Sequence, residues 1–571
     1  MTVLNPVTLQ YLPNELLKEI GCQSLLLNPA QNGKIPLCNL RLVCQQFDVA
    51  IQPLLFSEVR IKFGRRDIRQ TMLKLQSILA GSTRAFNSAK TLSIEFGDPY
   101  ADDDSSLLWL QPYMDWNMEE GESICDDDKD VLMEDQAELD LIHVTESVEW
   151  LRENLSLAIA SLSNVTSCKW DLGGCISYGT GTPRWLAISI LRGLAFLPTL
   201  EEFTWYIYGV SIPSLPLEWL SNLRKLEIIS TSLSNASHGL VQQVGRMVAS
   251  NPGLRHLHVR IKSEGLTSTL DDLFQSTSPS NSLQHLGMDG LGITGKMLAR
   301  YAPQHMKNLS SLEVRNSFIR PFDAGETMED FYSDQRLLDR NGIWRSLQRE
   351  DIHISRLKVD VICAGSALSD YLDSYSGAQS LLFVSDQEEF PKPEPVPDYF
   401  FRRVFERHSI TLTEIFLGPD CVSAWFNKDQ RICPLLQCQN LNTLGVALFP
   451  DFSLSLVHSL LDTIINLSKL KEARIHSYYP APTRSSSNVQ CVKGVRQFFC
   501  RAREEIIDSM ETFRGKGHPA CTSLQIIACR LRFSVIPGKV HGTYQLLPLN
   551  NCHTFGQEPS INDEGLDTWW W

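Results

Sequence analysis

The sequence lacks several features that would place it in a common class of protein. No run of about 18 apolar residues occurs in its 571 residues, so no transmembrane helix is expected. The opening MTVLNPVTLQYLPNELL has no basic start and no long apolar core, which predicts no secretory signal. The 15 cysteines include no CxxC pair, so we expect no zinc site and no disulfide framework. Scattered unpaired cysteines are typical of reduced proteins of the cytoplasm or nucleus.

Motifs of catalysis and of nucleic-acid binding are also missing. The sequence contains no GxxxxGK[ST] phosphate loop, no GxSxG turn and no HExxH pair. The glycine-rich stretch LGGCISYGTGTP (172–183) has the wrong spacing for a phosphate loop, so it is interpreted as an ordinary loop. No cluster of basic residues suggests a nucleic-acid partner. We therefore expect no enzymatic activity, no metal or other cofactor, and neither nucleic acid nor membrane as a partner.

Negative charge is concentrated in one segment. The net charge is −14, yet residues 98–140 hold 16 acids and a single base, Lys129, so the rest of the chain is close to neutral. Such composition predicts a disordered, solubilising insert. Trp109 and Trp116 make the segment more apolar than a spacer requires, so an alternative is that it screens the adjacent repeats or recruits a basic partner.

A short phrase, Leu-x-x-Leu-x-Val, recurs along the chain. A chain of this length exceeds the roughly 250–300 residues that one compact core holds, so several domains or an extended repeat are expected. The consecutive early copies begin 26 to 31 residues apart. The best copies are NLRKLEI (Leu223, Leu226, Ile228), GLRHLHV (Leu254, Leu257, Val259), SLQHLGM (Leu283, Leu286, Met288), NLSSLEV (Leu309, Leu312, Val314), TLTEIFL (Leu412, Ile415, Leu417) and NLNTLGV (Leu441, Leu444, Val446).

The spacing within the phrase predicts a short strand. Its second and third apolar positions are two residues apart and therefore share one strand face. Stretches with helical periodicity lie between copies, at 237–250, 452–465 and 494–513. One strand and one helix cannot bury their own apolar faces, but stacked copies can. The pattern resembles leucine-rich repeats over about residues 88–531. It implies an α/β fold class: a solenoid with parallel strands inside and helices outside.

Residues 9–56 predict a separate, small helical unit. Pro13 suits the first turn of a helix, and an apolar stripe follows it. A turn rich in proline, asparagine and glycine separates this helix from a second one, which Pro53 is expected to end. The apolar residues of the two helices are Leu12, Leu16, Leu17, Ile20, Leu40, Val43, Cys44, Phe47 and Ile51.

The order of these residues resembles the F-box family, in particular its fungal branch. The matching elements are Leu12-Pro13, Glu15-Leu16, Ile20 and the phrase Arg41-Leu42-Val43-Cys44-Gln45-Gln46-Phe47. The junction at residues 27–36 is longer and more polar than the compact form. The resemblance implies that the chain binds the Skp adaptor of a cullin–RING ubiquitin ligase. The adaptor-binding residues it implies are Leu12, Pro13, Leu16, Ile20, Leu40, Val43 and Phe47.

Strand alternation also predicts which side chains a target protein would meet. Residues between the buried positions of each phrase point to the opposite face. This face is mixed in sign, so it is either a solvated surface or a target-binding one. The candidate target-binding residues are His256, His258, Arg260, Arg315, Arg356, Lys358, Phe416 and Arg474.

The sequence thus predicts a non-catalytic substrate receptor of a Skp–cullin–F-box ligase. The alternative is a repeat scaffold without a ligase role, whose N-terminal helices only cap the solenoid. The expected segments are the F-box-like module (9–56), a first strand and repeat (57–97), the acidic insert (98–140), the solenoid (141–531) with loop insertions near 316–350 and 385–400, and a C-terminal cap or tail (532–571). Trp569-Trp570-Trp571 is interpreted either as part of that cap or as a partner motif.

Overall fold

The chain divides into two units, which are taken in turn. The structure is a computed structural model. It describes residues 15–17, 19–20, 45–64, 67–82, 88–96, 131–172, 183–207, 214–230, 237–261, 268–280, 282–315, 334–360, 366–384, 398–418, 434–448, 454–477, 523–528, 531–537 and 544–548. The first unit is Met1–Leu283 with Gly290–Gly292, and the second is Gln284–Asp289 with Ile293–Trp571.

The described part of the first unit is built on parallel strands that pair in chain order. Each strand is hydrogen-bonded to the next without a shift, so that Leu226 stands opposite Leu257. The strands are β1 (Glu58–Phe63), β2 (Thr91–Phe96), β3 (Ser167–Asp171), β4 (Glu202–Ile207), β5 (Lys225–Ser230) and β6 (His256–Ile261).

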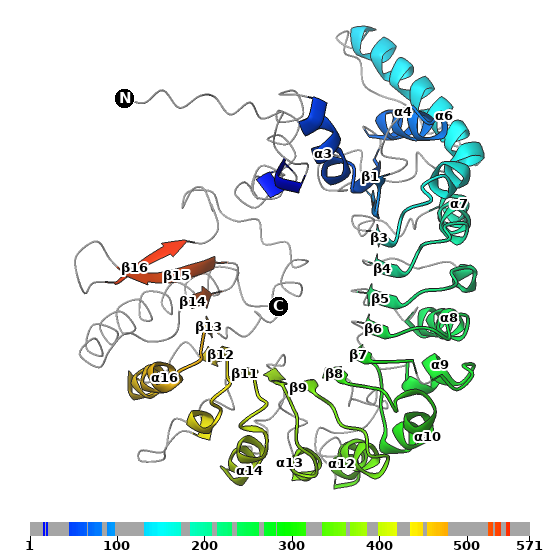
Figure 1. Cartoon of the computed structure of the whole chain (residues 1–571). Coiled ribbons are helices and arrows are strands. Elements are labelled where there is room, and N and C mark those ends of the chain that lie inside the picture. The colour runs from blue at the N-terminus through cyan, green and yellow to red at the C-terminus, as the bar shows by residue number, and fades with distance from the viewer. Residues whose placement is uncertain are drawn as a thin grey trace, which may run out of the picture. The chain divides into compact units, whose positions relative to one another are not determined.

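Helices connect these strands and lie on one side of them (Figure 1). They are α4 (Ile68–Leu79), α6 (Val131–Ala160), α7 (Arg184–Ala195), α8 (Ser237–Ala249) and α9 (Leu270–Phe274), with the short 3-10 turn η4 (Leu217–Trp219). No helix in the described ranges is long and apolar enough to cross a membrane.

The repeated phrase forms the core of this unit as its spacing predicts. Leu226 and Ile228 are fully buried, and so are Leu257 and Val259 one strand further on. Burying one such side chain contributes about 1.5–3 kcal/mol. Because the strands are in register, equal positions of successive phrases stack into continuous apolar rows, which a single repeat could not provide.

A buried asparagine holds one turn between helix and strand. The amide of Asn251 donates to the carbonyls of Leu220 and Met247, both at 2.7 Å, and its oxygen accepts from the N–H of Leu223 at 2.7 Å. These bonds satisfy backbone groups that would otherwise be buried without partners.

The second unit repeats the same plan. Parallel strands again pair in chain order. They are β7 (His285–Asp289), β8 (Ser311–Arg315), β9 (Arg356–Asp360), β10 (Ser380–Val384), β11 (Glu414–Leu417), β12 (Thr443–Leu448), β13 (Glu472–Ser477) and β14 (Ser523–Ala528). The last described strands, β15 (Leu531–Pro537) and β16 (Tyr544–Pro548), are antiparallel to their neighbours.

The helices of the second unit alternate with its strands. They are α10 (Gly295–His305), α12 (Asp334–Arg349), α13 (Ser366–Asp373), α14 (Asp398–His408) and α16 (Leu454–Asn466), with the 3-10 turn η6 (Pro434–Gln437). Helices α10 and α12 approach at a pair of glycines, since a Cβ on Gly295 would lie 2.7 Å from the backbone of Gly342. Glycine therefore permits a backbone contact that alanine would block.

The N-terminal helical residues pack as a small cluster beside the first strand. Residues 15–17 and 19–20 are helical, and α3 (Gln45–Leu55) follows. Leu17 is buried against Ala50, Ile51 and Leu55. The predicted end of the second helix at Pro53 is wrong, because α3 continues to Leu55 with this proline inside its last turn. A proline there removes only one helical hydrogen bond shortly before the helix ends.

The segment 57–97 holds β1, α4 and β2. Two other segments differ from the sequence-based ones. The insertion near 316–350, expected to be a loop, contains α12, whose Trp344 and Leu347 are buried. Helix α6 begins at Val131, inside the segment expected to be a disordered insert. Its beginning carries good helix formers such as Leu132 and Met133, which outweigh the acidic composition. The remainder of that insert, the expected helix at 494–513, the insertion near 385–397 and Trp569–Trp571 lie outside the described residues.

Candidate protein-interaction surfaces

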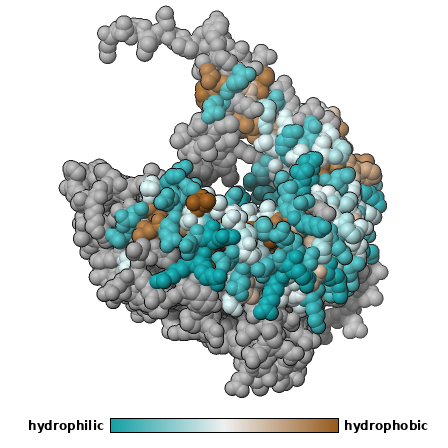
Figure 2. Space-filling view, turned by 60° about the horizontal axis from the view of Figure 1, so that its bottom comes forward, coloured by the Kyte–Doolittle hydropathy of each residue, from teal (hydrophilic) through white to brown (hydrophobic). Residues whose placement is uncertain are grey.

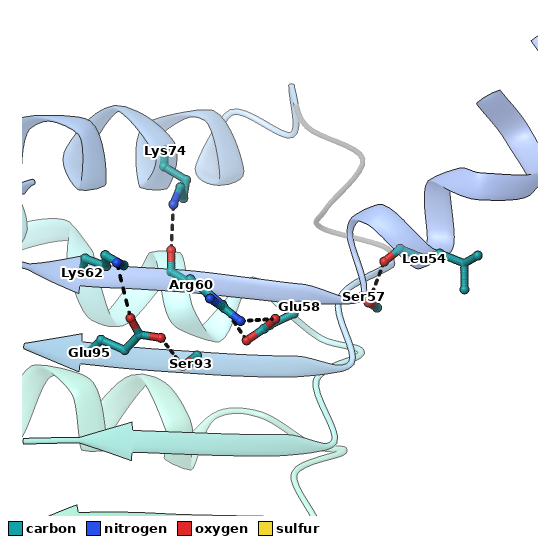
Figure 3. Close-up of polar contacts among 8 residues, drawn as sticks. All are labelled: Leu54, Ser57, Glu58, Arg60, Lys62, Lys74, Ser93 and Glu95. Atoms are coloured by element: carbon teal, nitrogen blue, oxygen red, sulfur yellow. Dashed lines mark hydrogen bonds and ion pairs between the residues drawn. The ribbon is translucent and has the colours of Figure 1, made fainter. Parts of the chain in front are cut away.

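The strand face of the first unit opposite its core is polar and internally paired. On β1, the first strand of this face, the Glu58 carboxylate accepts two hydrogen bonds from the Arg60 guanidinium, at 2.8 and 3.2 Å (Figure 3). On the next strand Glu95 lies 3.7 Å from the Lys62 ammonium and accepts a hydrogen bond from Ser93 at 3.0 Å. Positive and negative side chains alternate here, so the surface has no strong field of either sign.

A second cluster on the same face centres on Glu227 of β5. Its carboxylate lies 3.2 Å from Lys225 and 3.4 Å from the Nε2 atom of His256, and it accepts a hydrogen bond from Thr204 at 3.2 Å. Burial alone would raise the pKa of Glu227, but the hydrogen bond with His256 and the charge of Lys225 outweigh it and lower the pKa to about 2. Glu227 is therefore ionised throughout the physiological range.

The equivalent face of the second unit is far less accessible. Lys358 of β9 lies 2.8 Å from Glu313 of β8, and Arg315 lies 3.8 Å from Asp289. Arg315 is only 3% exposed, so these charged side chains are largely withdrawn from solvent, whereas Arg356 at the start of β9 is exposed. Burial lowers the pKa of Lys358 to about 8, against the opposing effect of Glu313.

An apolar strip continues this face along the next three strands. Leu382 of β10, Phe416 of β11 and Ala447 of β12 form a buried cluster of their own. They alternate with core residues, so they point away from the main core. A Cβ on Gly445 would lie 2.3 Å from the Phe416 ring, which shows that the ring lies directly over this glycine. The His476 ring of β13 packs against the Phe416 ring in a T-shaped arrangement, with ring centroids 5.3 Å apart.

The N-terminal helices carry exposed apolar side chains opposite their buried cluster. Leu17 points into that cluster, whereas the adjacent Leu16 is 51% exposed and Ile20 is 38% exposed. On α3, Val49 is 51% exposed. Hydrophilic residues dominate the described surface in Figure 2, where hydrophobic ones form small separate patches. Neighbouring exposed apolar residues on packed helices are a common mark of an interaction site.

These helices join the first repeat without a long linker. The Ser57 hydroxyl donates to the Leu54 carbonyl at 2.8 Å, at the end of α3 (Figure 3). The carbonyl of Ser57 accepts from the N–H groups of Lys90 and Thr91, at 2.8 and 2.9 Å. One residue thus connects the last helical turn to both β1 and β2.

The residues predicted from the sequence fall into two groups. Of the proposed adaptor-binding residues, Leu16 and Ile20 are exposed on the N-terminal helix, and Phe47 lies in α3. Leu12, Pro13, Leu40 and Val43 are outside the described residues, as is the side chain of Phe47.

Each of the eight target-face candidates alternates with core residues of its strand. In the first unit they are His256, His258 and Arg260 of β6. In the second unit they are Arg315, Arg356, Lys358, Phe416 and Arg474. Arg356 is exposed, and Arg474 is paired with Glu472 at 2.9 Å. Their role in binding stays a prediction.

Sequence reasoning missed several residues of these surfaces. Val49 falls outside the F-box motif positions, although its place two residues after Phe47 on an amphipathic helix could have indicated exposure. Leu382 and Ala447 were missed because the sequence alone does not show which face of a strand an apolar residue occupies. Such a residue is assigned to the main core until the strand register is known.

Comparison with known proteins adds little to this picture. No family model and no curated protein matches the chain. One matching solved structure is a leucine-rich-repeat protein of Leptospira interrogans, with 10% identity, covering 56% of this chain and 86% of that one at a TM-score of 0.18. A likeness at that level carries no argument. The chain's own repeated phrases and in-register parallel strands make each unit an α/β repeat of the leucine-rich-repeat kind, an architecture suited to binding other proteins.

Proposed function

We propose that the chain is the substrate-recognition subunit of a Skp–cullin–F-box type ubiquitin ligase. Its N-terminal helices bind the Skp adaptor, and the strand faces of its repeats bind a protein target. The chain itself performs no chemistry. It raises the local concentration of the target near subunits that transfer ubiquitin, and it acts in the cytoplasm or nucleus.

The exposure of Leu16 and Ile20 is the observation that carries the adaptor half of the proposal. The F-box resemblance assigns both residues to adaptor binding, and both are exposed while Leu17 between them packs inward. A helix that only stabilised its own domain would gain nothing from exposing these side chains. Apolar side chains on a helix, seated in a groove of the partner, are a general mode of such recognition.

The target half of the proposal is supported by the two strand faces. Repeat proteins commonly bind partners along the surface formed by successive repeats. In the first unit this surface is polar and mixed in sign, with Glu227 held ionised among Lys225 and His256. In the second unit ion pairs flank the apolar strip of Leu382 and Phe416. A target is therefore recognised by shape and local pairing more than by net charge.

The alternative is a scaffold whose N-terminal helices only cap the repeats. The cluster of Leu17, Ile51 and Leu55 favours it, because packing of this kind is what a cap requires. The two functions differ in whether the chain binds the adaptor.

Co-purification of the full chain with a Skp adaptor separates them. The receptor predicts a stable complex that the joint change Leu12→Ala/Pro13→Ala abolishes while the variant stays folded by circular dichroism. A wild-type chain that is folded yet never retains the adaptor would leave the scaffold as the function.

A further inference from the structure

The sheet of the first unit has an edge at its first strand. Among the described strands, β1 stands first in the order of the sheet and is hydrogen-bonded to β2 alone. Backbone N–H and C=O groups along such an edge form a template on which another strand can pair. The partners of these groups therefore decide whether the edge can accept a further strand.

Alternate residues of β1 direct their backbone groups toward this edge. The Ser57 carbonyl accepts from the N–H of Thr91, at the start of β2, at 2.9 Å. In a parallel pair each strand bonds its neighbour through every second residue, so Ser57 and the odd-numbered residues after it bond β2. The backbone groups of Glu58, Arg60 and Lys62 therefore point away from β2, along the edge of the sheet.

Two side chains of α4 occupy the outward carbonyls of this strand. The Lys74 ammonium donates to the Arg60 carbonyl at 2.7 Å (Figure 3). The Thr71 hydroxyl donates to the Lys62 carbonyl, also at 2.7 Å. Thr71 and Lys74 are three residues apart, so they lie on the same side of the helix. Thr71 is buried and its bond is shielded from water, whereas exposed Lys74 places a charge on the edge, which opposes strand addition.

The edge is self-complementary, so a second copy of the chain is suited to pair with it. In an antiparallel pair of β1 strands centred on Arg60, Glu58 of each copy stands opposite Lys62 of the other. These two opposite-charge pairs offset the repulsion between the facing Arg60 side chains. On the other face, Val59 stands opposite Ile61, and such β-branched residues favour strand pairing. An unprotected β1 would therefore favour association of two copies.

We propose that Lys74 and Thr71 of α4 close the edge of β1 and so prevent the chain from pairing edge to edge with a second copy. The carbonyls that they occupy, those of Arg60 and Lys62, are acceptors that an added strand requires. A second copy can use these acceptors only after both side chains have left them. This inference depends neither on adaptor binding nor on target binding by the strand faces.

The oligomeric state of the full chain tests the proposal. Lys74→Ala/Thr71→Val removes both donors, and valine keeps the shape of the buried threonine. Size-exclusion chromatography with light scattering is expected to show a monomeric wild type, and a double variant whose dimeric fraction rises with concentration. Lys296→Ala removes an exposed helical lysine of the second unit, so it is the control and should stay monomeric. A folded double variant that stays monomeric, or a wild type that dimerises as readily, would overturn the proposal.

A matched pair of substitutions shows whether the dimers form through β1. In the double-variant background, Arg60→Pro removes an outward N–H that an added strand needs but none that bonds β2, so it is expected to restore the monomer. Arg60→Ala keeps this N–H, so its dimers should persist. Circular dichroism and thermal unfolding confirm folding, and dimers that persist with Arg60→Pro would place the contact elsewhere and reject the proposal.

Hydrogen exchange gives a second readout that does not depend on the proline variant. In Lys74→Ala/Thr71→Val, protection of a peptide that contains residues 58–62 is expected to rise with protein concentration, because a paired strand shields the outward N–H groups. In the wild type the same peptide should show no dependence on concentration. Concentration-independent protection in a dimeric double variant would contradict pairing through β1.

Discussion

The Nδ1 atom of His408, at the end of α14, accepts a hydrogen bond from the backbone N–H of Gly377 at 3.2 Å. It also accepts from the N–H of Ala378 at 3.2 Å, and Nε2–H donates to the Leu372 carbonyl at 2.9 Å. The imidazole is fully buried. Because Nδ1 accepts from two donors, only the neutral ring fits, and the ring fixes the turn that leads into β10, where Gly377 has φ of +116°.

This arrangement predicts a local loss of stability in acid. Burial lowers the pKa of His408, helped by the charge of Arg407 and opposed by the Leu372 hydrogen bond and Asp373. In the unfolded chain the ring titrates near ~6.5. As the pH falls below that value, the unfolded state takes up a proton that the folded state refuses, so the free energy of unfolding decreases. The stabilisation is present above ~6.5 and is lost at lower pH.

Hydrogen exchange of a peptide that contains Gly377 and Ala378 measures this effect. We expect its protection factors to fall between pH 7.5 and 5.5 in the wild type, and to change much less in His408→Gln, which does not titrate. An equal fall in both proteins would show that another group is responsible.

The buried pair of Lys358 and Glu313 predicts an asymmetric response to substitution. Lys358→Met removes the cation that lies 2.8 Å from the largely buried carboxylate of Glu313, so it is expected to destabilise the second unit by about 3–5 kcal/mol. The double variant Lys358→Met/Glu313→Leu removes both charges and is expected to be more stable than the single one. Lys225→Met, at the more exposed pair of the first unit, is the control and should lose no more than about 1 kcal/mol. Urea unfolding compares them, and a double variant less stable than Lys358→Met would contradict the account.

Two helical glycines of the first unit predict opposite effects of the same substitution. A Cβ on Gly193 of α7 would lie 2.7 Å from Ile159 and 2.9 Å from the Ser156 carbonyl, so Gly193→Ala forces α7 away from α6. Overpacking of this kind destabilises by about 1–3 kcal/mol. A Cβ on Gly239 of α8 would have no neighbouring atom within 4 Å, so Gly239→Ala is expected to stabilise by about 0.5–1 kcal/mol. Thermal unfolding gives both values, and a neutral Gly193→Ala would mean that the two helices are further apart.

The repeat could be predicted from the sequence, but not every copy of it. The strands β5 to β8 were predicted because each phrase begins with leucine at regular spacing. Strand β10 was missed because its phrase is Ala378-x-x-Leu381-x-Phe383, in which alanine takes the place of the first leucine. The same repeat also buries Tyr371 and Tyr375, whose hydroxyls donate to the carbonyls of Ile352 and Ile354 at 2.7 Å.

The candidate surfaces were predicted only in outline. Alternation identifies which residues leave the core, so Lys358 and Phe416 were placed on the correct face. Alternation does not identify the residues that Lys358 and Phe416 contact. The pairing of Lys358 with Glu313 and the position of Phe416 over Gly445 depend on strands that are far apart in the chain. Exposure of Leu16 beside buried Leu17 likewise depends on where α3 packs.

The affinity of the purified full chain for a Skp adaptor, measured by calorimetry, tests the central claim most directly. Leu16→Ala/Ile20→Ala removes two exposed anchors without touching the cluster of Leu17, so the account predicts at least a roughly 100-fold weaker complex. Leu73→Ala, on α4, is the matched control because Leu73 is also 51% exposed, and its affinity should equal that of the wild type. A folded wild type without measurable affinity, or a double variant that binds as tightly as the wild type, would contradict the account.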